Sequence, residues 1–161
     1  MSELSQKHSL PEARTHDVDF HGWVSDQVSL IQRRRFDAVD WRNVIEELMA
    51  AARSEERALG SHFEILLIHL LKWCYQREQR DRHIASWEAS IMNARGRIER
   101  LIRRSPSLKS ELDETFRDAY LYARRRAGAE MGWRRERWER ELPDKCPWTI
   151  EQVRSDFWPD G

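Results

Sequence analysis

The chain has 161 residues, enough for one domain, and its 28 basic and 28 acidic residues give a formal net charge of zero at pH 7. This balance argues against a protein that acts mainly by covering nucleic acid with positive charge. Eight tryptophans and a hydrophobic content of 40% exclude a low-complexity disordered chain and indicate a globular one.

The cysteines and the apolar segments indicate in which cellular compartment the protein is expected. Cys74 and Cys146 are far apart and show no CxxC spacing, which is typical of proteins from a reducing compartment. The first residues, MSELSQKHSLPEARTHD, lack the apolar segment of a signal peptide. The longest uncharged apolar run, ILLIHLL at residues 65–71, is too short to span a bilayer. We therefore expect a cytoplasmic protein that does not associate with membranes.

After residue 16, apolar residues recur at helical spacing along almost the whole chain. The pattern predicts a flexible tail over residues 1–16 and a single all-α domain over residues 17–161. Within that domain we expect a bundle of about five main helices and a short C-terminal helix. The first helix should carry one apolar stripe, made of Phe20, Trp23, Val24, Val28 and Ile31. The second, capped by Asp40, should present Trp41, Val44, Ile45, Leu48 and Ala52.

Two serines are candidate starts of further helices. Ser54 is a candidate cap for a third helix that is apolar on nearly every side from Leu59 to Trp73, as is typical of a central, buried helix. The charged segment 76–82 then predicts a break, so the fourth helix should start near Ile84 or at Ser86. Its apolar stripe is the most regular in the chain and consists of Ile84, Trp87, Ile91, Ala94, Ile98, Leu101 and Ile102.

The C-terminal third of the chain predicts a fifth helix and a short last one. Pro106 should end the fourth helix and Ser107 should cap the fifth. Thr149 and Gln152 have the spacing of a capping box that opens the last helix. Two aromatic residues of the final segment, Phe157 and Trp158, are expected to pack onto the bundle.

His62 and His69 lie on one face of the predicted third helix. Their Cα atoms are about 10.5 Å apart along the helix axis at 1.5 Å per residue, which is too far for both to bind one metal ion directly. A metal site would need Glu47 or another acid from a neighbouring helix. A histidine that forms a hydrogen bond within the core is the simpler interpretation. We therefore assign no catalytic residue, metal or cofactor.

Two arginine-rich segments are candidate anion-binding surfaces. Arg97, Arg100 and Arg104 line up opposite the apolar stripe of the fourth helix, where they could hold phosphates. A simpler role for them is pairing with the acids that follow at residues 111–118 or with water. The second segment, residues 124–140, contains Arg134 and Arg135 between tryptophans, a pattern typical of single-stranded nucleic-acid binding or of a partner surface. Its three glutamates favour a partner surface.

Several segments, taken in order, resemble a bacterial family of uncharacterised all-helical proteins, domain of unknown function family 29. They are DFHGWVSDQVSLIQRRRFDAVDWRNVIEEL, HLLKWCYQ, SWEASI, SPSL, CPWTIEQV and FWP, which together cover about residues 18–159. The chain departs from the family pattern at Arg77, where a proline is usual, and in the arginine-rich WRRERWEREL. The resemblance implies a helical cytoplasmic protein and supplies no activity, cofactor or ligand. Among the matching polar positions, Gln27, Glu47 and His69 lie on or beside apolar stripes.

The leading hypothesis is a protein-interaction or regulatory module that forms a homodimer or binds another protein. One alternative is nucleic-acid binding through the arginine-rich helices. The other is a small metal-dependent enzyme or hydrolase with a site around Glu47, His62 and His69. The candidate polar pocket comprises Gln27, Glu47, His62 and His69. The candidate basic surface comprises Arg97, Arg100, Arg104, Arg134 and Arg135.

Overall fold

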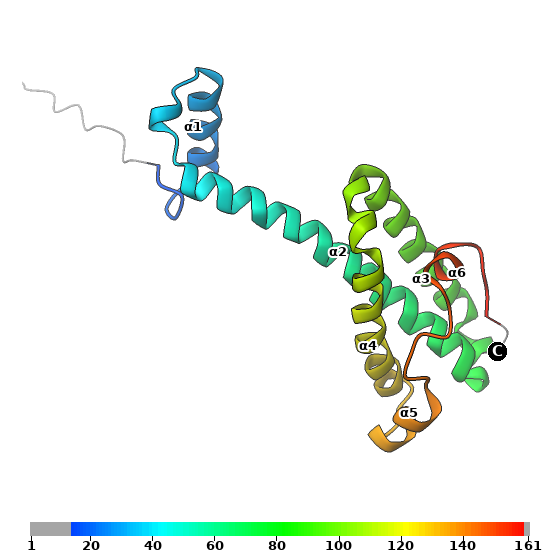
Figure 1. Ribbon diagram of the computed structural model, residues 1–161. Helices are drawn as coiled ribbons and strands as arrows, with labels where there is room; N and C mark the ends of the chain where they lie inside the picture. Colours follow the sequence, from blue (N-terminus) through cyan, green and yellow to red (C-terminus); the bar gives the residue numbers. More distant parts are fainter. Residues whose placement is uncertain (1–13, 160–161) are drawn as a thin grey trace, which may run out of the picture. The chain divides into compact units, whose positions relative to one another are not determined.

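A computed structural model describes residues 14–159 (Figure 1). All regular elements in this range are helical, which confirms the predicted all-α class and the short C-terminal helix. The α-helices are α1 (Phe20–Gln32), α2 (Trp41–Tyr75), α3 (Arg77–Arg104), α4 (Leu112–Glu130), α5 (Arg135–Glu141) and α6 (Ile150–Arg154); the 3-10 helices are η1 (Phe36–Ala38) and η2 (Pro106–Glu111). None of the described helices is both long and apolar enough to cross a membrane. Most of the predicted tail, residues 1–13, lies outside the described residues.

The contacts within the chain divide it into two compact units, Met1–Ala51 and Ala52–Gly161, called unit 1 and unit 2 below. Unit 1 contains α1, η1 and the first residues of α2. Unit 2 contains the remainder of α2 together with α3, η2, α4, α5 and α6.

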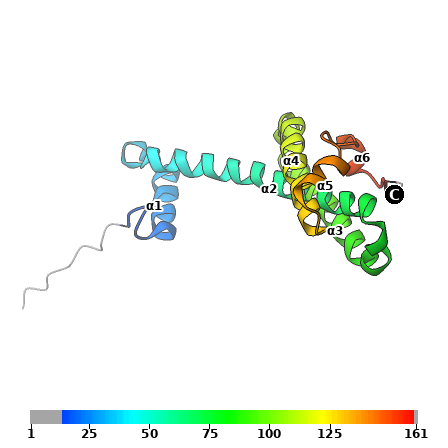
Figure 2. The same ribbon diagram turned by 90° about the horizontal axis from the view of Figure 1, so that it is seen from below.

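The core of unit 2 forms around the apolar segment of α2. Six side chains of this segment have no exposed surface: Leu59, Phe63, Leu66, Leu67, Leu70 and Leu71. At about 100° per residue they lie on one broad face of the helix. Ile65, on the opposite side, is 43% exposed, so this segment is buried on a broad face and not on nearly every side as predicted. The covering residues come from α3 and α4 and include Ile91, Ala94, Ile98, Phe116, Ala119, Tyr120 and Ala123. Figure 2 shows these helices from a second direction.

Three predicted helix starts were wrong. Ser54 lies inside α2, which continues from Trp41 to Tyr75, and Ser86 lies inside α3, which begins at Arg77. The segments around them are rich in Ala, Glu, Gln and Arg, which are strong helix formers, so one serine or a run of charges does not end the helix. Ser107 lies in η2, and α4 begins at Leu112 without a side-chain cap.

The other two predicted helix caps, at the starts of α2 and α6, are confirmed. An oxygen of the Asp40 side chain accepts a hydrogen bond from the backbone N–H of Asn43 at 3.4 Å, in the first turn of α2. Thr149 and Gln152 form the capping box of α6, each side chain accepting a hydrogen bond from the other's backbone N–H. After α4, Gly132 has a φ of 72°, a conformation that glycine adopts without strain.

The segment after α5 packs along unit 2 and completes its core. Leu142, Trp148, Ile150 and Val153 are buried there, and Figure 1 shows α6 close to α3, with which it makes contacts. The ring of Trp158 lies 4.7 Å from that of Trp73, measured between centroids. Phe157 and Trp158 are both packed against the core, as predicted.

Arg95 of α3 holds this final segment in place. Its side chain is buried and donates hydrogen bonds to the backbone carbonyls of Val153, at 2.8 Å, and Phe157. The guanidinium carbon also lies 5.3 Å from the ring centroid of Trp158. Burial lowers the pKa of Arg95, while Asp156 acts in the opposite direction. A buried cation therefore connects α3 to the end of the chain through backbone oxygens.

The substitution Arg95→Leu should lower the free energy of unfolding by about 2–4 kcal/mol, because it leaves buried carbonyl groups without donors. Urea denaturation followed by circular dichroism measures the change. Arg82→Leu, at an exposed position of the same helix, is the matched control and should alter stability by less than about 1 kcal/mol. Equal stability of the Arg95→Leu and wild-type chains would contradict this role.

Candidate functional site

The four residues of the candidate polar pocket have separate surroundings. Gln27 is buried in unit 1, and its side-chain oxygen accepts a hydrogen bond from the backbone N–H of Asp40 at 2.8 Å. This bond ties α1 to the residue that caps α2, so Gln27 has a structural partner. Glu47 also lies in unit 1, where its carboxylate is 2.7 Å from Nε2 of His16.

His16 was not identified from the sequence, because it lies in a segment without helical periodicity. Besides Glu47 it contacts Asp17 through Nδ1, at 3.0 Å, and its ring packs edge-on against Phe20 and Trp23. The hydrogen bonds to Asp17 and then Glu47 raise the pKa of His16 above the usual 6.5. The pair connects the residues before α1 with α2 inside unit 1.

The two histidines of unit 2 differ from each other. The ring of His69 is half-buried and donates a hydrogen bond from Nδ1 to the carbonyl of Ile65 in the same helix, at 2.8 Å. Nδ1 of His62 is buried and has no hydrogen-bond partner among the described residues. Burial lowers the pKa of both rings, and for His62 the nearby Arg97 and Arg100 lower it further. Within residues 14–159, no three His, Cys, Asp or Glu side chains are grouped as a metal site requires.

Of the candidate basic surface, the part on α3 forms a cleft. Arg97, Arg100 and Arg104 lie around a hollow of about 660 Å³ together with Arg103, His62, Ala58 and Leu101. Arg104 pairs with Glu55 of α2, at 2.7 Å, and Glu55 also accepts a hydrogen bond from Ser105. Of the two partners expected for these arginines, the acids at residues 111–118 form no ion pair with them among the described residues, and pairing with water stays a prediction. The remaining three arginines have no acidic partner among the described residues.

The second basic segment is mostly neutralised within the chain. Arg135 pairs with Glu139 at 2.7 Å, and Arg140 pairs with Glu141 at 2.8 Å. Arg124 donates to the carbonyl of Leu142, and Arg137 lies over the ring of Trp133. Arg134 is exposed at the start of α5. Most of these arginines therefore have contacts within the chain, while Arg134 has no acidic partner among the described residues.

A third feature is the exposed apolar surface of unit 1. The sequence pattern could not distinguish these exposed residues from residues of the core. Trp23 and Val39 are the buried large apolar side chains of described unit 1. Ten others are at least 36% exposed: Val18, Phe20, Val24, Val28, Ile31, Phe36, Trp41, Ile45, Leu48 and Met49. The stripes predicted for the first two helices exist, but most of their residues are uncovered in the single chain. Such an apolar surface is typical of an interface.

The His16–Glu47 pair makes the stability of unit 1 depend on pH. A histidine pKa raised by folding adds stability that is complete below pH 6.5 and is lost as the pH rises through the raised value. NMR titration of the His16 ring should therefore give a pKa above 6.5, and Glu47→Gln should lower it. If the pKa of His16 were 6.5 or less, or did not respond to Glu47→Gln, the pairing would be disproved.

Comparisons with known proteins give a family and no individual relatives. No curated protein and no solved structure matches the chain significantly. The model of one protein family, described as "Domain of unknown function DUF29", matches residues 15–158, which is nearly the whole chain. The resemblance inferred from the sequence motifs is thus confirmed, and the chain belongs to the DUF29 family.

Proposed function

We propose that the chain is a protein-interaction module that acts through unit 1, and that the partner of unit 1 is a second copy of the same chain. The observation that carries the proposal is the balance of apolar side chains in unit 1, where ten large ones are exposed and two are buried. Folding of so small a unit depends on burying such side chains, and unit 1 alone buries few of them.

The exposed residues form a continuous strip on each helix. On α1 they are Phe20, Val24, Val28 and Ile31, whose spacing of four, four and three residues places them side by side. They lie next to the buried edge that carries Trp23 and Gln27. On α2 the strip is Trp41, Ile45, Leu48 and Met49, again at helical spacing. We call the two strips together the apolar face of unit 1.

The size of this face suits a dimer. Described unit 1 spans residues 14–51, and chains below about 40 residues usually need a metal, disulfides or oligomerisation to fold. The eight large side chains of this face, with about half of their surface exposed, present an apolar area on the order of the 800 Å² that each partner contributes to a standard interface. A second copy brings an equal face, so two copies together can form the core that one lacks.

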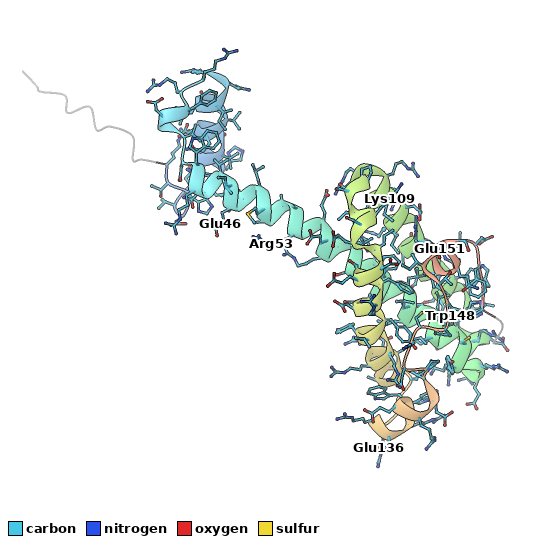
Figure 3. The ribbon with its side chains drawn as sticks, in the orientation of Figure 1. Glu46, Arg53, Lys109, Glu136, Trp148 and Glu151 are labelled. Carbon is cyan, nitrogen blue, oxygen red and sulfur yellow. The ribbon has the colours of Figure 1, made fainter. Side chains whose placement is uncertain are left out.

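Two charged side chains beside the strip of α2 are available to a partner. Glu46 and Arg53, labelled in Figure 3, both project from α2 on the same flank of the strip, and neither has a charged partner among the described residues.

Leu48→Glu should convert the protein from dimer to monomer at micromolar concentration, because it introduces a charge into the centre of the proposed interface. Leu48 is 68% exposed in the single chain, so the substitution leaves no cavity there. Light scattering coupled to size-exclusion chromatography gives the mass. The matched control is Leu121→Glu on α4, at 53% exposure, which should leave the dimer intact. A monomeric wild-type chain, or loss of the dimer in both variants, would refute the proposal.

A further inference from the structure

The arginine cleft of unit 2 is independent of the apolar face and has no role in the proposed association. Its cations come from one helix: Arg97, Arg100, Arg103 and Arg104 all belong to α3. The other wall is formed by Ala58 and His62 of α2. Leu101 and Ala58 provide apolar surface between the charged groups, so the cleft combines cations with a hydrophobic floor.

Most cations of this cleft have no partner within the described residues, and the cleft groups them on one short stretch of α3. Arg95 and Arg124 donate to backbone carbonyls, and Arg126, Arg135 and Arg154 pair with glutamates. In the cleft only Arg104 has an acidic partner, Glu55. Arg97, Arg100 and Arg103 are exposed cations of one helix, and none of them forms an ion pair with a described acid.

We propose that this cleft binds a small anion that carries two or more linked phosphate groups. Guanidinium groups present paired donors that match the oxygens of phosphate, and they keep their charge at every physiological pH. One phosphate monoester carries about −1.5 to −2 charge, so three free arginines are better balanced by a di- or triphosphate than by a single phosphate. The apolar floor suits an organic group attached to the phosphates.

His62 supplies a second observation at the same place. Nδ1 of its ring is buried without a hydrogen-bond partner in the described residues, and the ring lines the cleft. After burial, Arg97 and Arg100 are the groups that lower the pKa of His62, so this ring senses the positive potential of the cleft. An anion bound between the arginines would reduce that potential, and the pKa of His62 would rise.

The dimensions favour a small molecule over a nucleic-acid strand. A volume of about 660 Å³ lies within the range of roughly 300–1,000 Å³ that is typical of small-molecule sites. From Arg97 to Arg104 the helix advances about 10.5 Å, whereas binding of a strand requires a groove that follows several nucleotides. The second basic segment, which could have extended such a groove, is engaged in internal contacts.

Calorimetric titration of the full chain with pyrophosphate and with ATP, at about 50 mM salt, tests the proposal. The expected result is saturable binding of one anion per chain. Arg97→Gln/Arg100→Gln should weaken binding about ten-fold or more, since each lost charged hydrogen bond is substantial. Arg82→Gln/Arg125→Gln removes two exposed arginines of unit 2 outside the cleft and should bind like wild type. Unchanged circular dichroism melts show that both variants are folded.

Two further measurements distinguish binding of a small phosphate compound in the cleft from binding of a nucleic-acid strand. In NMR spectra, pyrophosphate should shift the ring signals of His62 and raise its pKa, while the exposed ring of His21 in unit 1 should not shift. A single-stranded oligonucleotide should bind more weakly than ATP. The proposal is overturned if neither phosphate binds, if binding is equal in the two double variants, or if the oligonucleotide binds more tightly.

Discussion

Burial of apolar side chains is distributed very unevenly along α2, and the rest of the structure depends on that distribution. From Leu59 to Trp73 the helix has a broad apolar face whose large side chains are buried, while Ile65 on the other side is 43% exposed. Each such side chain contributes about 1.5–3 kcal/mol, so this segment anchors α3, α4 and the C-terminal residues. From Trp41 to Met49 the same helix has one apolar strip, and that strip remains exposed. Unit 2 therefore has an extensive core of its own, whereas most large apolar side chains of described unit 1 are exposed in the single chain.

The arginines of this neutral chain serve three different purposes. Buried ones, such as Arg95, bind backbone carbonyls and hold segments that have no regular structure. Exposed ones on α4 and α5 form short-range ion pairs with glutamates. Those in the cleft of α3 have cationic neighbours and few acidic ones. A net charge of zero thus conceals a local excess of positive charge, and a function can depend on the local excess even when the whole chain is balanced.

Much of unit 2 could be predicted from the sequence, while the role of unit 1 could not. Helical periodicity identified the apolar stripes correctly, and the capping residues Asp40 and Thr149 follow from local chemistry. Periodicity shows which residues share a face of a helix, but it does not show whether the chain has anything to cover that face. The stripe of Phe20, Val24 and Val28 therefore looked like core. The His16–Glu47 pair and the cleft beside His62 arise from contacts between segments distant in sequence, which one sequence does not reveal.

Amide hydrogen exchange at two protein concentrations tests most directly whether unit 1 depends on a second copy. If unit 1 completes its core by association, amides of residues 20–49 should be protected at high concentration and should exchange faster after dilution below the dissociation constant. Amides of the buried α2 segment, residues 59–73, should keep the same protection at both concentrations. Equal protection of residues 20–49 at both concentrations, in a sample that light scattering shows to be monomeric when dilute, would contradict the account.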